Sequence, residues 1–140
     1  VNQNRYSIFD RTIEKNGLKK MSAELKKGIV AFSPLAQGLL TDRYLNGIPE
    51  DSRIARDPRF LKSSALTPAR LAQIRALNEV AKSRGQDLAE MALAWDLKDA
   101  DVTSVIIGAS KPSQILDNIK AIQNVNFTPE QLAEIDRITL

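Results

Sequence analysis

The sequence contains no cysteine and no histidine among its 140 residues. The chain therefore forms no disulfide and supplies no Ser-His-Asp or Cys-His nucleophile and no histidine-ligated zinc site. Its six glycines are scattered, so neither a Rossmann fingerprint nor a P-loop spacing is present. No apolar run is long enough to span a bilayer. Without such a run or a secretory leader pattern, we expect a cytoplasmic protein with no membrane insertion. The 20 basic and 17 acidic residues are interspersed, so no nucleic-acid partner is expected, and no metal site is expected either.

Short apolar runs alternate with helical patterns along the chain. Strands are expected within residues 2–9, at 28–32 and at 102–107, where the run Val105-Ile106-Ile107 suits burial on both faces. Helices are expected over 17–27, over 67–85 and after residues 87, 112 and 128, and a long loop is expected over 42–65. This order predicts an α/β fold with parallel strands and outer helices.

Capping residues and apolar spacing define the expected helices. N-terminal caps are predicted at Thr67, Asp87 and Thr128. Inward-facing side chains are predicted at Leu18, Met21 and Leu25, at Leu71, Ile74, Leu77 and Ala81, at Leu88, Met91, Ala92 and Trp95, at Ile115, Ile119 and Ile122, and at Leu132, Ile135 and Ile138. Solvated positions are predicted for Lys19, Lys20, Lys26, Lys27, Asp99 and Asp101, and packing roles for Tyr6 and Tyr44.

The turn after the third expected strand is a candidate phosphate site. Gly108 and Ser110 end the strand, and Lys111 adds a positive charge beside the free amides of the helix that starts there. An ordinary strand-turn-helix connection with a solvated lysine explains the same residues. A second turn of small residues, 33–41, follows the strand at 28–32, and a (β/α)8 barrel offers two such loops after its seventh and eighth strands.

Two motifs, SPLAQGLLTDRYLNGIPEDSR at 33–53 and VTSVIIGASKPSQILDNI at 102–119, resemble the C-terminal half of the aldo-keto reductases. The similarity is greatest to the branch that contains bacterial glyceraldehyde-phosphate-type reductases and potassium-channel β subunits. The resemblance implies that residues 1–140 are a single partial domain, the C-terminal half of a (β/α)8 TIM barrel with its cofactor-binding loops. Since a complete barrel has roughly 250 residues, we expect the N-terminal half of the same barrel as a partner.

The resemblance also implies contacts with a nicotinamide cofactor. Gln3 would hydrogen-bond the carboxamide, and Phe32 would stack on the nicotinamide ring. The pyrophosphate would be approached by Ser33, Pro34, Leu35, Ala36 and Gly38, with Arg43 and Arg53 folding over the cofactor and Gly108 in the same site. Ser110 and Lys111 would hold the 2′-phosphate, which predicts NADP(H), and Gln114, Asp117 and Asn118 would grip the adenosine end. The loop 42–65 is expected to become ordered over the pyrophosphate when the cofactor binds.

The reaction that this resemblance implies is NADP(H)-dependent reduction of a small aldehyde or ketone to an alcohol. No catalytic residue carries over, because the family's Tyr, Lys, Asp and His lie in the N-terminal half and neither Tyr6 nor Tyr44 occupies that context. The 140 residues alone are therefore expected to be inactive. Two alternatives stay open: an NADPH-binding regulatory subunit of a membrane channel, and a small α/β binding module without a cofactor. A homo-oligomer is compatible with each of them.

Overall fold

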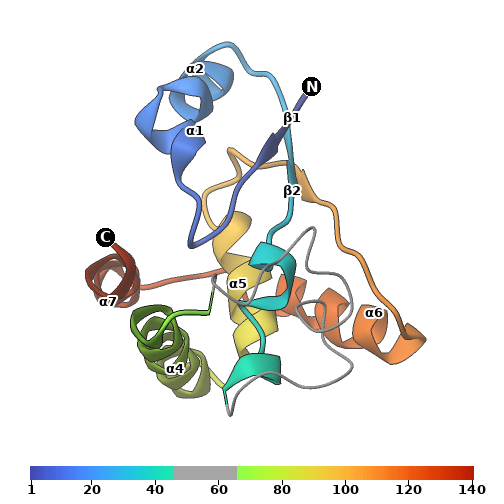
Figure 1. The fold of residues 1–140 in the computed structure, drawn as a ribbon. Coiled ribbons are helices and arrows are strands. Elements are labelled where there is room, and N and C mark those ends of the chain that lie inside the picture. Colours follow the sequence, from blue (N-terminus) through green and yellow to red (C-terminus); the bar gives the residue numbers. More distant parts are fainter. Residues whose placement is uncertain (46–65) are drawn as a thin grey trace.

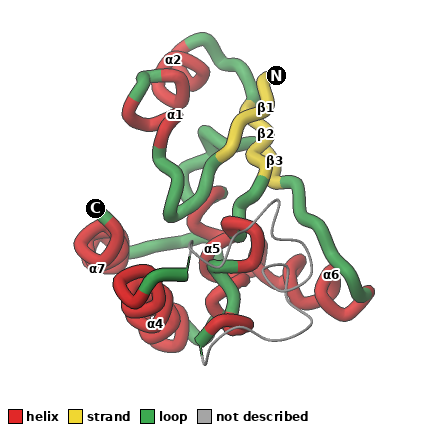
Figure 2. The backbone as a smooth tube through the Cα atoms, in the orientation of Figure 1, coloured by secondary structure: helices red, strands yellow, loops and turns green. Residues whose placement is uncertain are grey.

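The computed structural model describes residues 1–45 and 66–140. Three strands, β1 (Asn2–Arg5), β2 (Ile29–Phe32) and β3 (Ser104–Val105), form a parallel sheet in that order. In its register Gln3 pairs with Val30, and Arg5 pairs with Phe32. Figures 1 and 2 show the strands side by side near the N-terminus, with α4, α5, α6 and α7 below them. The parallel arrangement brings the carboxyl ends of all three strands to one edge of the sheet.

Helices fill the connections between the strands, as the sequence predicts. They are α1 (Thr12–Lys15), α2 (Leu18–Glu24), α4 (Pro68–Ser83), α5 (Leu88–Asp96), α6 (Pro112–Asn118) and α7 (Pro129–Thr139), with short 3-10 turns η1 (Ala36–Gly38), η2 (Asp42–Tyr44) and η4 (Ile119–Gln123). The short helix α1 is not predicted from the sequence. No helix in the described ranges is long and apolar enough to cross a membrane.

The predicted helix caps are confirmed. The Thr67 hydroxyl accepts a hydrogen bond from the Arg70 amide at 3.0 Å, and the Asp87 carboxylate accepts one from the Glu90 amide at 2.7 Å. At the start of α7 the Thr128 hydroxyl accepts from the Gln131 amide, while the Gln131 side-chain oxygen accepts from the Thr128 amide, both at 3.1 Å. Each cap satisfies helix-end amides that have no partner within the helix.

The core forms around α5, which is buried along most of its length. Trp95 is 1% exposed and packs against the fully buried Tyr6, with 5.1 Å between ring centroids, so its predicted role as a core residue is confirmed. The Tyr6 hydroxyl accepts a hydrogen bond from Lys98 Nζ at 3.1 Å, and burial raises the pKa of this hydroxyl far above its ordinary value. Four residues that were predicted to face inward are buried: Ile74, Leu77 and Ala81 on α4, and Ile135 on α7.

The prediction that β3 is buried on both faces is wrong. Ser104 and Ile106 are exposed, and the regular ladder is limited to Ser104–Val105, although the Ile106 amide still donates to the Ala31 carbonyl at 2.8 Å. The reason is topological. Among the described strands β3 pairs only with β2, so it is an edge strand of this sheet.

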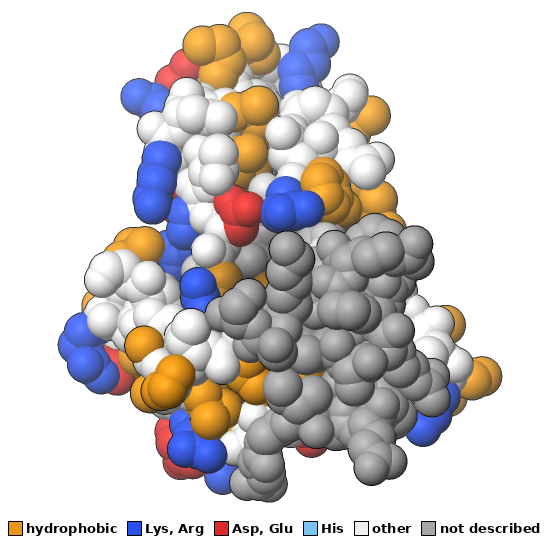
Figure 3. Space-filling model, in the orientation of Figure 1, with side chains coloured by type: hydrophobic (Ala, Val, Ile, Leu, Met, Phe, Trp, Pro, Cys, Tyr) orange, Lys and Arg blue, Asp and Glu red, His pale blue; other side chains and the backbone are white. Residues whose placement is uncertain are grey.

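Two predicted inward faces point to solvent instead. On α2, Met21 is 58% exposed and Leu25 is also exposed, while Lys19 and Ser22 are the buried residues. Along α6 and η4, Ile115, Ile119 and Ile122 are exposed, with Ile115 at 47%. Figure 3 shows hydrophobic side chains at the surface over α2 at the top of the view and beside α6 at its right edge. Both apolar faces therefore lie uncovered by the described part of the chain.

Lys19 is buried rather than solvated, which corrects a second prediction for α2. Its side chain is packed against the loop before β3, where Nζ donates to Asp101 Oδ2 at 2.9 Å and also to Asp99. Burial alone would lower the pKa of Lys19, but the hydrogen bonds to both carboxylates raise it above its ordinary value. Asp99 and Asp101 are thus ion-pair partners that tie α2 to this loop, not merely solvated turn residues.

Candidate functional site

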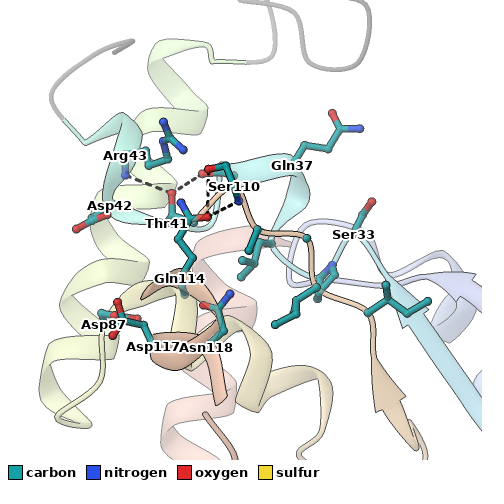
Figure 4. Close-up of a pocket in the computed structure, with 18 of the residues that line it drawn as sticks. Ser33, Gln37, Thr41, Asp42, Arg43, Asp87, Ser110, Gln114, Asp117 and Asn118 are labelled. Atoms are coloured by element: carbon teal, nitrogen blue, oxygen red, sulfur yellow. Dashed lines mark hydrogen bonds between the residues drawn. The ribbon is translucent and has the colours of Figure 1, made fainter. Parts of the chain in front are cut away.

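A cavity of about 800 Å³ lies at the carboxyl ends of β2 and β3. Its walls come from the turns that follow β2, from the N-terminal end of α5, from residues 106–110 after β3 and from one side of α6. A volume of this size matches the range for cofactors and drug-sized ligands. Figure 4 shows Thr41, Ser110 and Gln114 close together, with Asp87, Asp117 and Asn118 below them and with Ser33 and Gln37 to one side.

Most of the residues predicted to contact a cofactor meet in this cavity. Those that line it are Phe32, Ser33, Pro34, Leu35, Gly38, Arg43, Gly108, Ser110, Gln114, Asp117 and Asn118. Ala36 lines a smaller neighbouring cavity instead, and Gln3 and Lys111 line neither of the two. Arg53 and most of the predicted loop 42–65 lie outside the described residues. Their predicted roles stay predictions.

The turn after β2 is held in an unusual backbone conformation. Ser33, Ala36 and Gln37 have positive φ angles of 54°, 50° and 58° without being glycine, and Gly38 has φ +99°. Such backbone conformations cost energy for residues with a side chain and concentrate at functional sites. The buried Leu40, together with Leu39, anchors the turn in the core. The result is a compact turn that folds back beside the cavity.

Thr41 fixes the end of this turn. Its hydroxyl donates to the Gly38 carbonyl at 2.6 Å and accepts from the Arg43 amide at 3.2 Å, which starts η2. The buried ring of Tyr44 lies 3.6 Å from the position that a Cβ on Gly38 would take. Arg43 is thereby placed on the cavity wall by backbone contacts.

The candidate phosphate turn differs in one respect from its prediction. Gln114 Oε1 accepts hydrogen bonds from the amides of Ser110 at 2.8 Å and Lys111 at 3.3 Å, so two amides expected to be free are already bonded. The Ser110 hydroxyl donates to the same oxygen at 3.3 Å. An anion here would therefore depend chiefly on the Lys111 ammonium group. Lys111 is exposed and forms no ion pair with any described residue.

Arginine and carboxylate side chains both line the cavity. Figure 4 places Arg43, Asp42 and Ser110 in the upper part and Asp87, Asp117 and Asn118 together in the lower part. In the upper part the Arg43 guanidinium can bind a negatively charged group, with the Asp42 carboxylate beside it, whereas the lower part suits hydroxyl and amino groups that donate hydrogen bonds. A ligand with a phosphate near Arg43 and a nucleoside near Asp117 is compatible with this arrangement.

Several cavity residues were not predicted. They are Gln37, Thr41, Asp42, Tyr44, Asp87, Ala89, Ile106, Ile107 and Ala109. The sequence predicts Asp87 only as a helix cap, and that role does not indicate a position on a cavity wall. Thr41 is the last residue of the small-residue turn and Asp42 follows it directly, and this position is the one signal that could have identified them.

β1 places two side chains on the face that points away from the helices. The Asn2 side chain donates to the Ser22 hydroxyl on α2 at 3.3 Å, so Asn2 faces the helix layer. Strand side chains alternate, and Gln3 and Arg5 are accordingly exposed on the opposite face. The Arg5 guanidinium lies over the Phe32 ring, 5.6 Å from its centroid. Gln3 therefore lies on the same face of the sheet as Arg5, which contacts the Phe32 ring. Gln3 itself lines neither cavity.

The family model for the aldo/keto reductase family matches residues 1–139. The chain belongs to the aldo/keto reductase family. It is 48% identical over 140 residues to the L-glyceraldehyde 3-phosphate reductase of Escherichia coli O157:H7, covering 98% of this chain and 40% of that protein. It is 36% identical over 142 residues to a Schizosaccharomyces pombe protein named as a voltage-gated potassium channel subunit beta, covering 99% and 41%. The predicted branch of the family is confirmed.

A solved aldo/keto reductase shares the fold. The glycerol dehydrogenase of Gluconobacter oxydans matches with a TM-score of 0.77 and 28% identity, covering 97% of this chain and 41% of that structure. This match and the parallel sheet confirm the predicted partial (β/α)8 barrel. The chain spans about two fifths of the length of the curated relatives that it matches.

Proposed function

We propose that this chain supplies the cofactor-binding part of an NADP(H)-dependent reductase that converts small aldehydes or ketones to alcohols. The observation that carries the proposal is the cavity of about 800 Å³, in which residues from separate segments of a family member meet at the carboxyl ends of the strands. In (β/α)8 barrels this is the edge at which active sites lie.

The cavity's donor set fits a phosphorylated dinucleotide. Arg43 provides positive charge and the Ser33 hydroxyl a hydrogen-bond donor for phosphate oxygens, and the Ser110 hydroxyl could add a second donor by leaving Gln114 Oε1. Gly108 lines the cavity, and a Cβ there would meet no heavy atom within 4 Å, so its surroundings leave room for a ligand. Lys111 beside Ser110 adds a cation for a 2′-phosphate, which is the feature that favours NADP(H) over NAD(H).

The chain's own residues would bind and orient the nicotinamide end. When bound, the cofactor supplies a hydride to the carbonyl carbon. Phe32, at the end of β2, would stack on the nicotinamide and fix the ring face turned to the substrate, with the Gln3 amide on the neighbouring strand holding the carboxamide. Asp117 and Asn118 on α6 would bind the adenosine end.

The carbonyl oxygen also needs a proton, and neither tyrosine of this chain suits that task. Tyr6 is fully buried with its hydroxyl bonded to Lys98, and Tyr44 is buried beside Gly38. We therefore assign the acid to the N-terminal half of the barrel, supplied as a partner. This assignment includes the expectations that the chain alone is inactive and that the complete protein is cytoplasmic.

A second candidate function is supported by one comparison. The 36% identity to a protein named as a potassium channel subunit beta favours an NADPH-binding regulatory subunit. Both functions need the same cofactor cavity, so cofactor binding does not separate them.

The experiment is a titration of the full-length protein with NADPH and NADH, followed by fluorescence, and then an assay of NADPH oxidation with glyceraldehyde-type substrates. We expect preferential NADPH binding and measurable turnover. Binding without turnover, together with co-purification of a channel protein, would favour the regulatory subunit. If NADPH does not bind, both proposals fail and a binding module without cofactor is favoured. Cell fractionation checks the location, and light scattering checks the oligomeric state.

A further inference from the structure

A second cavity, of about 240 Å³, opens beside the first at the carboxyl ends of β1 and β2. The two cavities share Ser33 and Gln37 in their walls. Arg5, the last residue of β1, lines the second cavity and also lies over the Phe32 ring that lines the first. A group bound in the second cavity would therefore lie next to whatever stacks on Phe32.

Arg5 is available to bind an anion there. It forms no ion pair with any described residue, and its side chain is exposed. Asp10 is the acidic residue of the same cavity wall, but its Oδ1 already accepts hydrogen bonds from the Thr12 amide at 3.1 Å and the Thr12 hydroxyl at 2.7 Å. Among the described residues, the Arg5 guanidinium thus lines the cavity with the Phe32 ring as its neighbour and without an acidic partner, while Asp10 is held by its hydrogen bonds to Thr12.

We propose that Arg5 binds an oxyanion carried by the substrate, so that the preferred substrates are small aldehydes or ketones with a phosphate or carboxylate group. The proposal rests on the proposed function, because it assumes that the reacting carbonyl lies beside Phe32. The planar guanidinium of arginine presents parallel N–H donors that match the oxygens of either group. The volume of the second cavity suits one such group and a few carbon atoms, not a second nucleotide.

Arg5 also has a purely structural interpretation, as a cation that supports the Phe32 ring. In that case its loss would alter cofactor stacking and affect all substrates alike. A role in substrate binding would affect only the anionic ones. Matched substrates therefore separate the two interpretations.

The experiment measures kcat and KM in the full-length protein for glyceraldehyde against glyceraldehyde 3-phosphate, and for butanal against succinic semialdehyde. The variants are Arg5→Gln and Arg5→Lys, with Arg137→Gln on the exposed side of α7 as a matched control. For Arg5→Gln we expect kcat/KM to fall about tenfold or more for the anionic member of a pair, mainly through KM, and less than about twofold for the neutral member. Arg5→Lys should recover part of the loss, and the control should change neither.

Each outcome decides the proposal. A larger loss for the phosphate pair or for the carboxylate pair identifies which oxyanion is bound, whereas equal losses for neutral and anionic substrates would overturn the proposal. If the protein reduces no aldehyde, the proposed function fails separately. Calorimetric titration of the NADPH complex with glycerol 3-phosphate, succinate and glycerol then decides, because an Arg5-dependent preference for the anions supports the inference and its absence refutes it.

Discussion

Replacing Asp96 should stabilise the protein, because the carboxylate is buried without a hydrogen bond. Neither of its oxygens has a partner among the described residues, and the side chain is fully buried at the end of α5. The two nearby cations are engaged elsewhere: Arg11 donates to Asp136 at 3.0 Å, and Lys98 donates to the Tyr6 hydroxyl. Burial therefore raises the pKa of Asp96 well above its ordinary value, despite the attraction of both cations.

The expected gain in the free energy of unfolding follows from the missing hydrogen-bond partner of Asp96. An unsatisfied buried polar group costs about 1–3 kcal/mol, so Asp96→Leu should raise the free energy of unfolding by about that amount at pH 7. The corresponding rise in Tm is about 2 °C per kcal/mol in the longer full-length protein, because the shift becomes smaller as chain length grows. The isosteric Asp96→Asn removes the charge but keeps an unpaired polar group, so its gain should be smaller.

The pH dependence gives the sharper test. A carboxyl whose pKa is raised on folding contributes its full stability below the unfolded pKa of about 3.9 and loses it as pH rises towards the folded pKa. The advantage of Asp96→Asn over the wild type should therefore be small near pH 4 and grow as pH rises. Thermal unfolding of the full-length protein from pH 4 to 9 measures this. A lower Tm for both variants at pH 7, or a pH-independent difference, would refute the reasoning.

Three further predictions concern the cofactor cavity and α2. Lys111→Ala should weaken NADPH binding about 10- to 100-fold with little effect on NADH, since a charged hydrogen bond is worth about 1.5–3 kcal/mol; equal losses in a fluorescence titration would contradict this. Gly38→Ala should lower stability by about 1–2 kcal/mol because φ is +99°, whereas Gly108→Ala should weaken NADPH binding without lowering Tm. Lys19→Met should lower the free energy of unfolding by about 1–2 kcal/mol, because it removes both ion pairs. The loss stays below that of a fully buried pair because the two carboxylates are partly exposed. The stability difference between the wild type and Lys19→Met should be full below the unfolded lysine pKa of about 10.4 and lost as pH rises through the raised folded pKa. A difference that persists above the folded pKa in unfolding titrations argues against the ion pair.

Features that depend on neighbouring residues could be predicted from the sequence. The caps at Thr67, Asp87 and Thr128 are such features, because a cap needs only a side chain and an amide three residues later. Most candidate cofactor residues of the two motifs that the structure describes also meet in one cavity, because parallel strands bring their carboxyl ends to the same edge.

Features that depend on distant partners could not be predicted. Lys19 is buried because Asp99 and Asp101, 80 and 82 residues further along the chain, approach it in the fold. The bonded amides of Ser110 and Lys111 depend on the side-chain conformation of Gln114, which helix periodicity does not specify. The cavity beside Arg5 likewise combines the end of β1 with the turn after β2, and neither segment alone signals it.

The wrongly predicted helix faces support the proposed partner. Periodicity places Met21 and Leu25 on an inward face of α2, and Ile115, Ile119 and Ile122 on an inward face of α6 and η4, yet all are exposed. These helices accompany the two outer strands of the sheet, β1 and β3, each of which has one edge unpaired within the described part of the chain. In a closed (β/α)8 barrel no strand has a free edge, and each outer helix packs between two neighbours. The apolar pattern of α2 and α6 is thus what a closed barrel requires on the two sides at which the N-terminal half would join.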